Sequence, residues 1–314
     1  MKKYEFTGEV KVVFGITLHR IRASVSFGVV VKGELGGWIE KEENLSQNGN
    51  AWVYGNAEVY GNAWVCGNAE VYGNTKVYGN AWVYGNAKVY GDAKVYGNAE
   101  VYGNAKVCDD AWVYGDAKVC GDAKVYGNAE VYGNTKVYGN AKVCGNAEVC
   151  GDTEVCGDTK VYGNAEVYGN TKVYDDAWVY GNTKVYGDTE VCGDAEVYGN
   201  AKVCDDAWVY GDAKVYGNTK VYGNAKVYGN AEVCGNAEVC GNAKVCGNAD
   251  YIVFKNWWSS GRYFTWTRSN NKWRVGCFFG TGAELIAKAY KDSGQSGREY
   301  ERVVKYVESI LNEQ

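Results

Sequence analysis

Residues 87–92, Ala-Lys-Val-Tyr-Gly-Asp, are one copy of a six-residue phrase that repeats without insertion from Ala51 to Asn248. The phrase is Ala or Thr, then Lys, Glu or Trp, then Val, then Tyr or Cys, then Gly (Asp at three corners), then Asn or Asp. Its 198 residues (248 − 51 + 1) make 33 consecutive hexads (198/6). Internal repetition at a short fixed period predicts a solenoid, in which each turn buries its apolar face against its neighbours.

The order of residues within a hexad predicts the path of the chain. Period-2 alternation places Ala87 and Val89 inside and Lys88 and Tyr90 outside. Gly91 and Asp92 supply a corner, because Gly, Asn and Asp tolerate the positive φ of a tight turn. Three hexads therefore close an 18-residue triangular coil, and 33 hexads give 11 coils (33/3). At ~4.8 Å per rung the shaft would be roughly 50 Å long.

The hexads resemble those of left-handed parallel β-helix proteins with hexapeptide repeats. That family has an aliphatic residue at every sixth position, which Val53 to Val245 match, and a small residue two positions earlier, matched by Ala or Thr from 51 to 243. The resemblance implies a left-handed coil. We therefore expect an all-β solenoid at 51–250, an N-terminal β cap at 1–50 and a small α+β domain at 251–314.

The composition fits a soluble protein of a reducing cytoplasm. Proline is absent, as expected where backbone N–H groups enter hydrogen-bonded ladders. No apolar run is long enough to cross a membrane, and no leader pattern precedes the first strand-like residues. Eleven of the twelve cysteines take the outward Tyr position, and no two of them are separated by one coil of three hexads, so none faces another on the next rung within disulfide reach. These are Cys66, Cys108, Cys120, Cys144, Cys150, Cys156, Cys192, Cys204, Cys234, Cys240 and Cys246.

Two features of the repeat could carry a site. Lys88, Lys106, Lys124, Lys142 and Lys160 recur at every third hexad and should form a basic stripe, either a phosphate track or an ordinary solvated face. The double-Asp corners could be calcium ligands, or corners in which Asp has replaced Gly, which is the interpretation we favour. They are Asp109-Asp110, Asp175-Asp176 and Asp205-Asp206.

Enzymatic chemistry on the repeat is disfavoured. The acyltransferases and zinc carbonic anhydrases that share the hexapeptide fold use histidine as a general base or as metal ligands, whereas His19, outside the repeat, is the only histidine of the chain. The eight threonines of the repeat occupy inward positions, which argues against an ice-binding array. We expect no catalytic residue, no metal and no cofactor.

Residues 1–50 suggest short strands at 4–6, 10–14 and 17–23, with Gly8 and Gly15 at turns. A solenoid end exposes unpaired ladder groups, so this segment is expected to cap the coil, with His19 in a structural role. The motifs His-Arg-Ile-Arg-Ala at 19–23, Glu-Leu-Gly-Gly-Trp-Ile-Glu at 34–40 and Asn-Leu-Ser at 44–46 are similar to those of uncharacterised phage and prophage hexapeptide-repeat proteins.

Residues 251–314 change character, and they resemble a domain of unknown function appended to phage proteins. Three strands are expected at 251–256, 262–268 and 272–278. Two helices should follow, opened by capping boxes at Thr281 to Glu284 and Ser296 to Glu299.

The strand region of this domain interleaves cations with tryptophans and contains no acidic residue between 251 and 280. Such a surface suits nucleotides or single strands, with bases stacked on rings and phosphates paired to Arg. The alternative, which we favour, is a solenoid cap whose aromatic residues pack against the last coil while its cations stay solvated. The candidate ligand-binding residues are Trp257, Trp258, Arg262, Trp266, Arg268, Lys272, Trp273 and Arg274.

Three hypotheses for function follow. The first is a non-enzymatic phage or prophage accessory protein, in which a rigid solenoid presents terminal modules and residues 251–314 bind a host protein or nucleic acid. The second is capture of a nucleotide, such as a host immune signal, by the Arg/Trp module. The third is a structural protein that assembles with itself through exposed Tyr and Trp faces.

Overall fold

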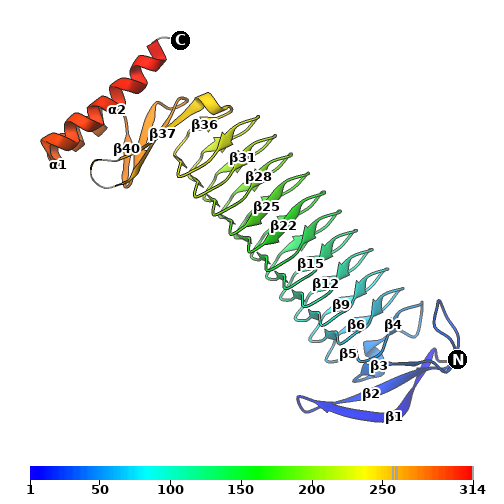
Figure 1. Ribbon diagram of the computed structural model, residues 1–314. Helices are drawn as coiled ribbons and strands as arrows, with labels where there is room; N and C mark the ends of the chain where they lie inside the picture. The colour runs from blue at the N-terminus through cyan, green and yellow to red at the C-terminus, as the bar shows by residue number, and fades with distance from the viewer. Residues whose placement is uncertain (257, 259–260, 313–314) are drawn as a thin grey trace. The chain divides into compact units, whose positions relative to one another are not determined.

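The computed structural model describes residues 1–256, 258 and 261–312. The fold is a parallel β-solenoid of about 12 coils, followed by a small antiparallel sheet and two helices, so the predicted fold class is confirmed (Figure 1). The chain divides into two compact units, Met1–Asn182 and Thr183–Gln314, and each is described by itself.

Each hexad forms a short strand and a corner, as the alternation predicts. In β10 (Lys88–Val89) the side chains of Ala87 and Val89 are fully buried, while Lys88 and Tyr90 are half-buried on the outside. Gly91 turns the corner with a φ of 76°. All eight inward threonines are buried, and seven of them are seen to donate their hydroxyl groups to the carbonyl three residues back, as Thr135 does to Tyr132 at 2.6 Å. Burying a hydroxyl that has a carbonyl partner costs little free energy, which explains why either Thr or Ala can occupy this position.

The coils of unit 1 stack into three parallel sheets, one for each side of the triangle. Paired residues on successive rungs are one coil apart in sequence, as Lys88 and Lys106 are. Sheet A contains β3 (Leu35–Ile39), β5 (Glu58–Val59), β8 (Lys76–Val77), β11 (Lys94–Val95), β14 (Trp112–Val113), β17 (Glu130–Val131), β20 (Glu148–Val149) and β23 (Glu166–Tyr168). Sheet B contains β4 (Trp52–Val53), β7 (Glu70–Val71), β10, β13 (Lys106–Val107), β16 (Lys124–Val125), β19 (Lys142–Val143), β22 (Lys160–Gly163) and β25 (Trp178–Gly181). Sheet C contains β6 (Trp64–Val65), β9 (Trp82–Val83), β12 (Glu100–Val101), β15 (Lys118–Val119), β18 (Lys136–Val137), β21 (Glu154–Val155) and β24 (Lys172–Val173).

Ladders of like side chains run along these sheets. The rings of Tyr78, Tyr96, Tyr114 and Tyr132 stack in parallel, with centroids 4.7–4.9 Å apart. At the corners each amide donates to the next, as Asn80 does to Asn98 at 3.0 Å. Because a coil core of Val, Ala and Thr is thin, these outer ladders add contacts that the interior lacks.

The N-terminal segment contains a long hairpin and an extra coil. Strand β1 (Tyr4–Val13) pairs with β2 (Ile16–Ala23), and β2 pairs with β3. We expected two strands separated by a turn at Gly8, which was wrong: β1 is continuous, and Gly8 lies where its register shifts. A local irregularity of this kind lets the strand bend without ending.

The solenoid begins before the first hexad. Strand β3 pairs in parallel with β5, with Trp38 opposite Glu58, and Leu45 bridges Val65 after the 3₁₀ turn η1 (Glu42–Asn44). The sequence separation of both pairs is longer than the three hexads of a regular coil. This irregular first coil lies inside the predicted N-terminal cap, so the solenoid has about one coil more than the 11 expected.

In unit 2 the coils continue as three sheets. Sheet D contains β26 (Lys184–Tyr186), β29 (Lys202–Val203), β32 (Lys220–Val221) and β35 (Glu238–Val239). Sheet E contains β28 (Glu196–Val197), β31 (Lys214–Val215) and β34 (Glu232–Val233). Sheet F contains β27 (Glu190–Val191), β30 (Trp208–Val209), β33 (Lys226–Val227) and β36 (Lys244–Val245), which the 3₁₀ turn η2 (Asn248–Asp250) follows.

The C-terminal domain is a four-stranded antiparallel sheet covered by two helices. Its strands are β37 (Tyr251–Lys255), β38 (Tyr263–Thr267), β39 (Lys272–Val275) and β40 (Phe278–Gly280); three were expected, and β40 was missed. Helix α1 (Gly282–Asp292) begins with the predicted capping box of Thr281 and Glu284. Helix α2 (Gly294–Asn312) begins earlier than predicted, because the Ser293 hydroxyl accepts the Ser296 N–H at 3.0 Å.

Candidate functional site

The predicted tryptophans form the core of the C-terminal domain. Trp266 and Trp273 are only 1% and 2% exposed, and they pack with Phe264, Leu285 and Val304 beneath the helices. Trp258 packs against the same cluster. Trp266 and Trp273 therefore neither stack bases at the surface nor pack against the last coil, so both roles predicted for these rings are wrong. Trp257 lies outside the described residues.

The opposite face of this sheet caps the last solenoid coil. Inside the coils, an outward residue donates its N–H to a carbonyl one rung further along, as Tyr222 does to Val239 at 3.0 Å. The last rung has no such carbonyl. Side-chain oxygens replace it: Thr265 accepts the N–H of Glu238 at 2.9 Å, and Ser269 accepts that of Lys244 at 2.6 Å.

Residues at the end of the last coil complete the cap. Asn248 Oδ1 accepts the Glu232 N–H at 2.8 Å, and Asp250 Oδ2 accepts that of Cys246 at 2.8 Å. The hydroxyl of Tyr251 donates to the Glu232 carbonyl, also at 2.8 Å. Unpaired buried backbone groups are costly, so the domain seals an end that would otherwise pair with another chain.

The cations predicted to bind ligands divide into two groups. Arg274 and Arg262 line adjoining hollows between sheet D and the capping sheet. Arg268 lies at the turn after β38, and Lys272 begins β39; neither is among the residues that line those hollows. The structure therefore brings together only part of the predicted set.

Arg274 belongs to a charged cluster around Glu238. Its Nε lies 3.2 Å from a Glu238 oxygen, and Lys220 Nζ lies 2.9 Å from the other oxygen. The guanidinium also covers the Tyr222 ring, 5.5 Å from the centroid. Burial alone would raise the pKa of Glu238, but the hydrogen bonds and charges of Lys220 and Arg274 outweigh it and hold the pKa below its ordinary value.

The first hollow is an open groove of about 420 Å³. Lys202, Lys220 and Arg274 line it together with Glu238, so its charged groups sum to +2 (three cations and one carboxylate). The groove is also lined by Tyr186, Tyr222, Cys204, Gly276 and Cys277.

The second hollow, of about 330 Å³, shares Lys220, Glu238 and Gly276 with the first and adds Arg262 and Tyr263. Gly276 has a φ of 56°, a conformation that favours glycine. We call the two hollows together the cationic groove. Four cations around one carboxylate can bind phosphate or carboxylate groups, and guanidinium groups can do so with two parallel hydrogen bonds.

Sequence reasoning missed Lys202, Lys220 and Glu238 because they stand in ordinary hexads. Their spacing of one coil was the signal that could have found them: it places Lys184, Lys202, Lys220 and Glu238 in one row, which ends where the C-terminal domain begins. The contact between this row and Arg274 depends on how the C-terminal sheet packs on the last coil, which the spacing of the hexads does not contain.

The other sequence candidates have structural roles. Asp109 and Asp205 turn corners with φ of 59° and 63°, and each accepts the N–H of the glycine one coil later. The described residues contain no group of three or more potential metal ligands. His19 stacks on Phe6, with ring centroids 4.8 Å apart. All twelve cysteines lie among the described residues and are free thiols.

Comparison with known proteins finds no family model and no curated sequence that matches this chain. Within the part of the chain that the structure describes, neither helix is long and apolar enough to span a bilayer.

Proposed function

We propose that this protein is a non-enzymatic binding scaffold, a phage or prophage accessory protein that acts in the cytoplasm of a bacterial host. On this proposal, the C-terminal unit binds an anionic group of a host macromolecule in the cationic groove. The solenoid coils supply a stiff support, because each rung is fixed to the next by backbone ladders and side-chain stacks.

The observation that carries the proposal is the convergence of Lys202, Lys220, Arg262 and Arg274 around a single carboxylate. Glu238 is engaged by Lys220 and Arg274, and the described residues give Lys202 no ion pair. Uncompensated positive charge in a concave site attracts anions. The burial of Trp266 and Trp273 favours the groove as the binding site, because it removes the tryptophan rings as an alternative surface for a ligand.

Charge reversal in the groove tests the proposal on the full chain. The variant K202E/K220E places Glu where other hexads already carry it, so the coil should fold normally. The matched control K226E/K244E makes the same charge change on sheet F. Tagged proteins are compared by affinity purification from a bacterial lysate and mass spectrometry. We expect a partner that wild type and control retain and that the groove variant loses; identical partners for all three would contradict the proposal.

A nucleotide is the second candidate ligand, because the groove also contains tyrosine rings. Tyr186, Tyr222 and Tyr263 line it beside the cations, so a base could stack where the tryptophans cannot reach. Isothermal titration with a panel of linear and cyclic nucleotides tests this candidate. Binding heat that K202E/K220E abolishes would support it, and absence of heat for the wild-type protein would remove it.

A further inference from the structure

The five lysines predicted to form a stripe do line up along one sheet of unit 1. Lys88, Lys106, Lys124, Lys142 and Lys160 occupy successive rungs of sheet B, each paired in register with the next. Both ends of the row are compensated: Lys88 lies 2.9 Å from Glu70, and Lys160 lies 3.8 Å from the Trp178 ring centroid.

The middle of the row is not compensated. Lys106, Lys124 and Lys142 have only lysines above and below them, and the described residues give them no ion pair. The other lysines of these coils face an acid on the next rung, as Lys118 faces Glu100 at 3.0 Å, or lie over a ring, as Lys94 does 4.0 Å from the Trp112 centroid. Like charges held one rung apart repel each other, so this row would gain from an anionic surface.

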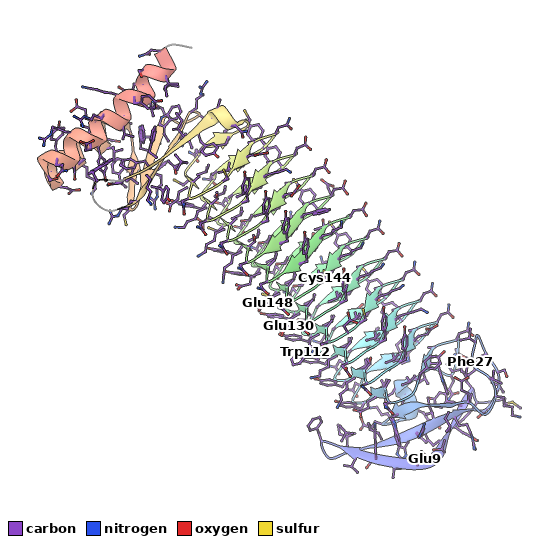
Figure 2. All side chains as sticks on the ribbon, in the orientation of Figure 1. Glu9, Phe27, Trp112, Glu130, Cys144 and Glu148 are labelled. Carbon is purple, nitrogen blue, oxygen red and sulfur yellow. The ribbon has the colours of Figure 1, made fainter. Side chains whose placement is uncertain are left out.

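The neighbouring side of the same coils carries the opposite charge. Glu130, Glu148 and Glu166 occupy successive rungs of sheet A, each one hexad after a lysine of the row (Lys124, Lys142 and Lys160). The hydroxyls of Tyr114 and Tyr132 hold Glu130 and Glu148. Neither Glu130 nor Glu148 has a cation partner among the described residues. Figure 2 shows Trp112, Glu130 and Glu148 along one side of the coils, with Cys144 away from that edge.

The two rows have the same spacing. Neighbours in each row are one coil apart on paired strands, and the stacked tyrosine rings beside Glu130 repeat every 4.7–4.8 Å. A lysine row on one molecule can therefore face an acidic row on another rung by rung. Two rigid rows of different spacing would lose register after a few residues.

We propose that the protein associates side by side with further copies of itself, Lys106, Lys124 and Lys142 of one copy facing Glu130, Glu148 and Glu166 of the next. Each copy carries both rows, so the contact is heterologous and can continue into a ring or an open array. Exposed ion pairs are individually weak, so the association depends on several pairs acting together and on low salt. This inference is independent of the cationic groove.

A second copy fits the lysine row better than a nucleic acid does. The chain carries a net charge of −5, and the acidic row lies on the adjacent side of the same coils. A long polyanion on the lysine row would therefore run beside three carboxylates. A second copy offers a matching row and places its own acids against the lysines.

The test is a charge swap followed by mixing. The lysine-row variant is K106E/K124E/K142E, and the acidic-row variant is E130K/E148K/E166K. Both put residues where other hexads already carry them, so folding should be preserved, and circular dichroism checks this. The control K94E/K226E/K244E makes the same charge change at three lysines outside both rows, none of which forms an ion pair among the described residues. Sedimentation velocity measures the mass of each full chain over a concentration series at low and high salt.

We expect wild type and control to form larger species at low salt and to dissociate at high salt. Each swap variant alone should be monomeric, and an equimolar mixture of the two should associate again. A monomeric wild type at every concentration, or association that survives the lysine swap, would overturn the proposal. If the wild type stayed monomeric and bound labelled single-stranded DNA, and the lysine-row variant did not bind it, the proposal would be overturned and the row would be assigned to a polyanion.

Discussion

The corner glycine of each hexad has a conformation that few other residues adopt. Gly115 has a φ of 70°, and a Cβ added there would lie 2.9 Å from the backbone nitrogen of Gly133. Asp109 nevertheless occupies the same corner position with a φ of 59°. Its carboxylate accepts the Gly127 N–H at 3.1 Å, so a bond to the next rung offsets part of the strain.

This comparison predicts that the two substitutions G115A and G115D differ in cost. Alanine would keep the positive φ and the close contact without any new bond, and should lower the free energy of unfolding by about 1–2 kcal/mol. Aspartate should cost less, because its carboxylate can accept the Gly133 N–H as Asp109 accepts that of Gly127. Urea unfolding of the two variants measures the difference. Equal losses would show that the carboxylate bond contributes nothing.

The direction of side chains along a strand is predictable from its period of two, in the hexads and in the C-terminal strands alike. Alternation with period 2 placed every Val, Ala and Thr of the coils correctly, and all are buried. This period puts Trp273 and Arg274 on opposite faces of β39, so the two side chains cannot contact the same ligand. Interleaved Trp and Arg along a strand therefore indicate a buried face and a polar face.

At the scale of elements, the ends of the solenoid are the parts that sequence periodicity could not describe. The first coil is longer than three hexads and follows no hexad pattern, and the capping sheet has a short fourth strand, β40. The need for a cap was predictable, because a coil end leaves ladder groups unpaired. Which side chains satisfy those groups, such as Lys3 donating to the Ala51 carbonyl at 2.9 Å, depends on tertiary packing.

Removing one capping oxygen should weaken the last coil. Thr265 is 2% exposed, and valine has nearly its shape, so T265V deletes the acceptor of the Glu238 N–H with little change in packing. A buried donor left unpaired costs about 1–3 kcal/mol. We expect faster hydrogen exchange at the Glu238 amide and lower stability of unit 2.

The control for this variant is T267V, because Thr267 is also buried but its hydroxyl bonds Asn270 within the sheet. Exchange at Glu238 should be unchanged in the control. If T265V left the exchange of Glu238 as it is in the wild type, Thr265 would not be the group that caps this strand.

At the scale of the whole molecule, the outward tyrosines couple folding to alkaline pH. Burial raises the pKa of Tyr54 and Tyr60 to about 12. Hydrogen bonds to cysteine side chains, and then burial, raise the pKa of Tyr102, Tyr126 and Tyr138 to about 12 as well. In the unfolded chain all five should ionise near the ordinary tyrosine pKa of about 10.

The sign of the effect follows from proton binding. Between pH 10 and about 12 the folded protein holds more protons on these tyrosines than the unfolded chain does, so the free energy of unfolding falls as pH rises. Below pH 10 their stabilising contribution is fully present. Lys3 acts in the opposite sense, because burial lowers its pKa from 10.5 to about 8, but its effect falls between those two pH values and so mostly below the window of the tyrosines.

We therefore expect steep alkaline unfolding in which tyrosine ionisation and loss of β structure occur together. A pH titration that follows tyrosinate absorbance and circular dichroism on the same samples measures both. Tyrosinate should appear later than in a urea-unfolded sample and then rise with the unfolding transition. Ionisation of most tyrosines near pH 10 with the coil intact would mean that the stacked rows are open to solvent and contribute no proton-linked stability.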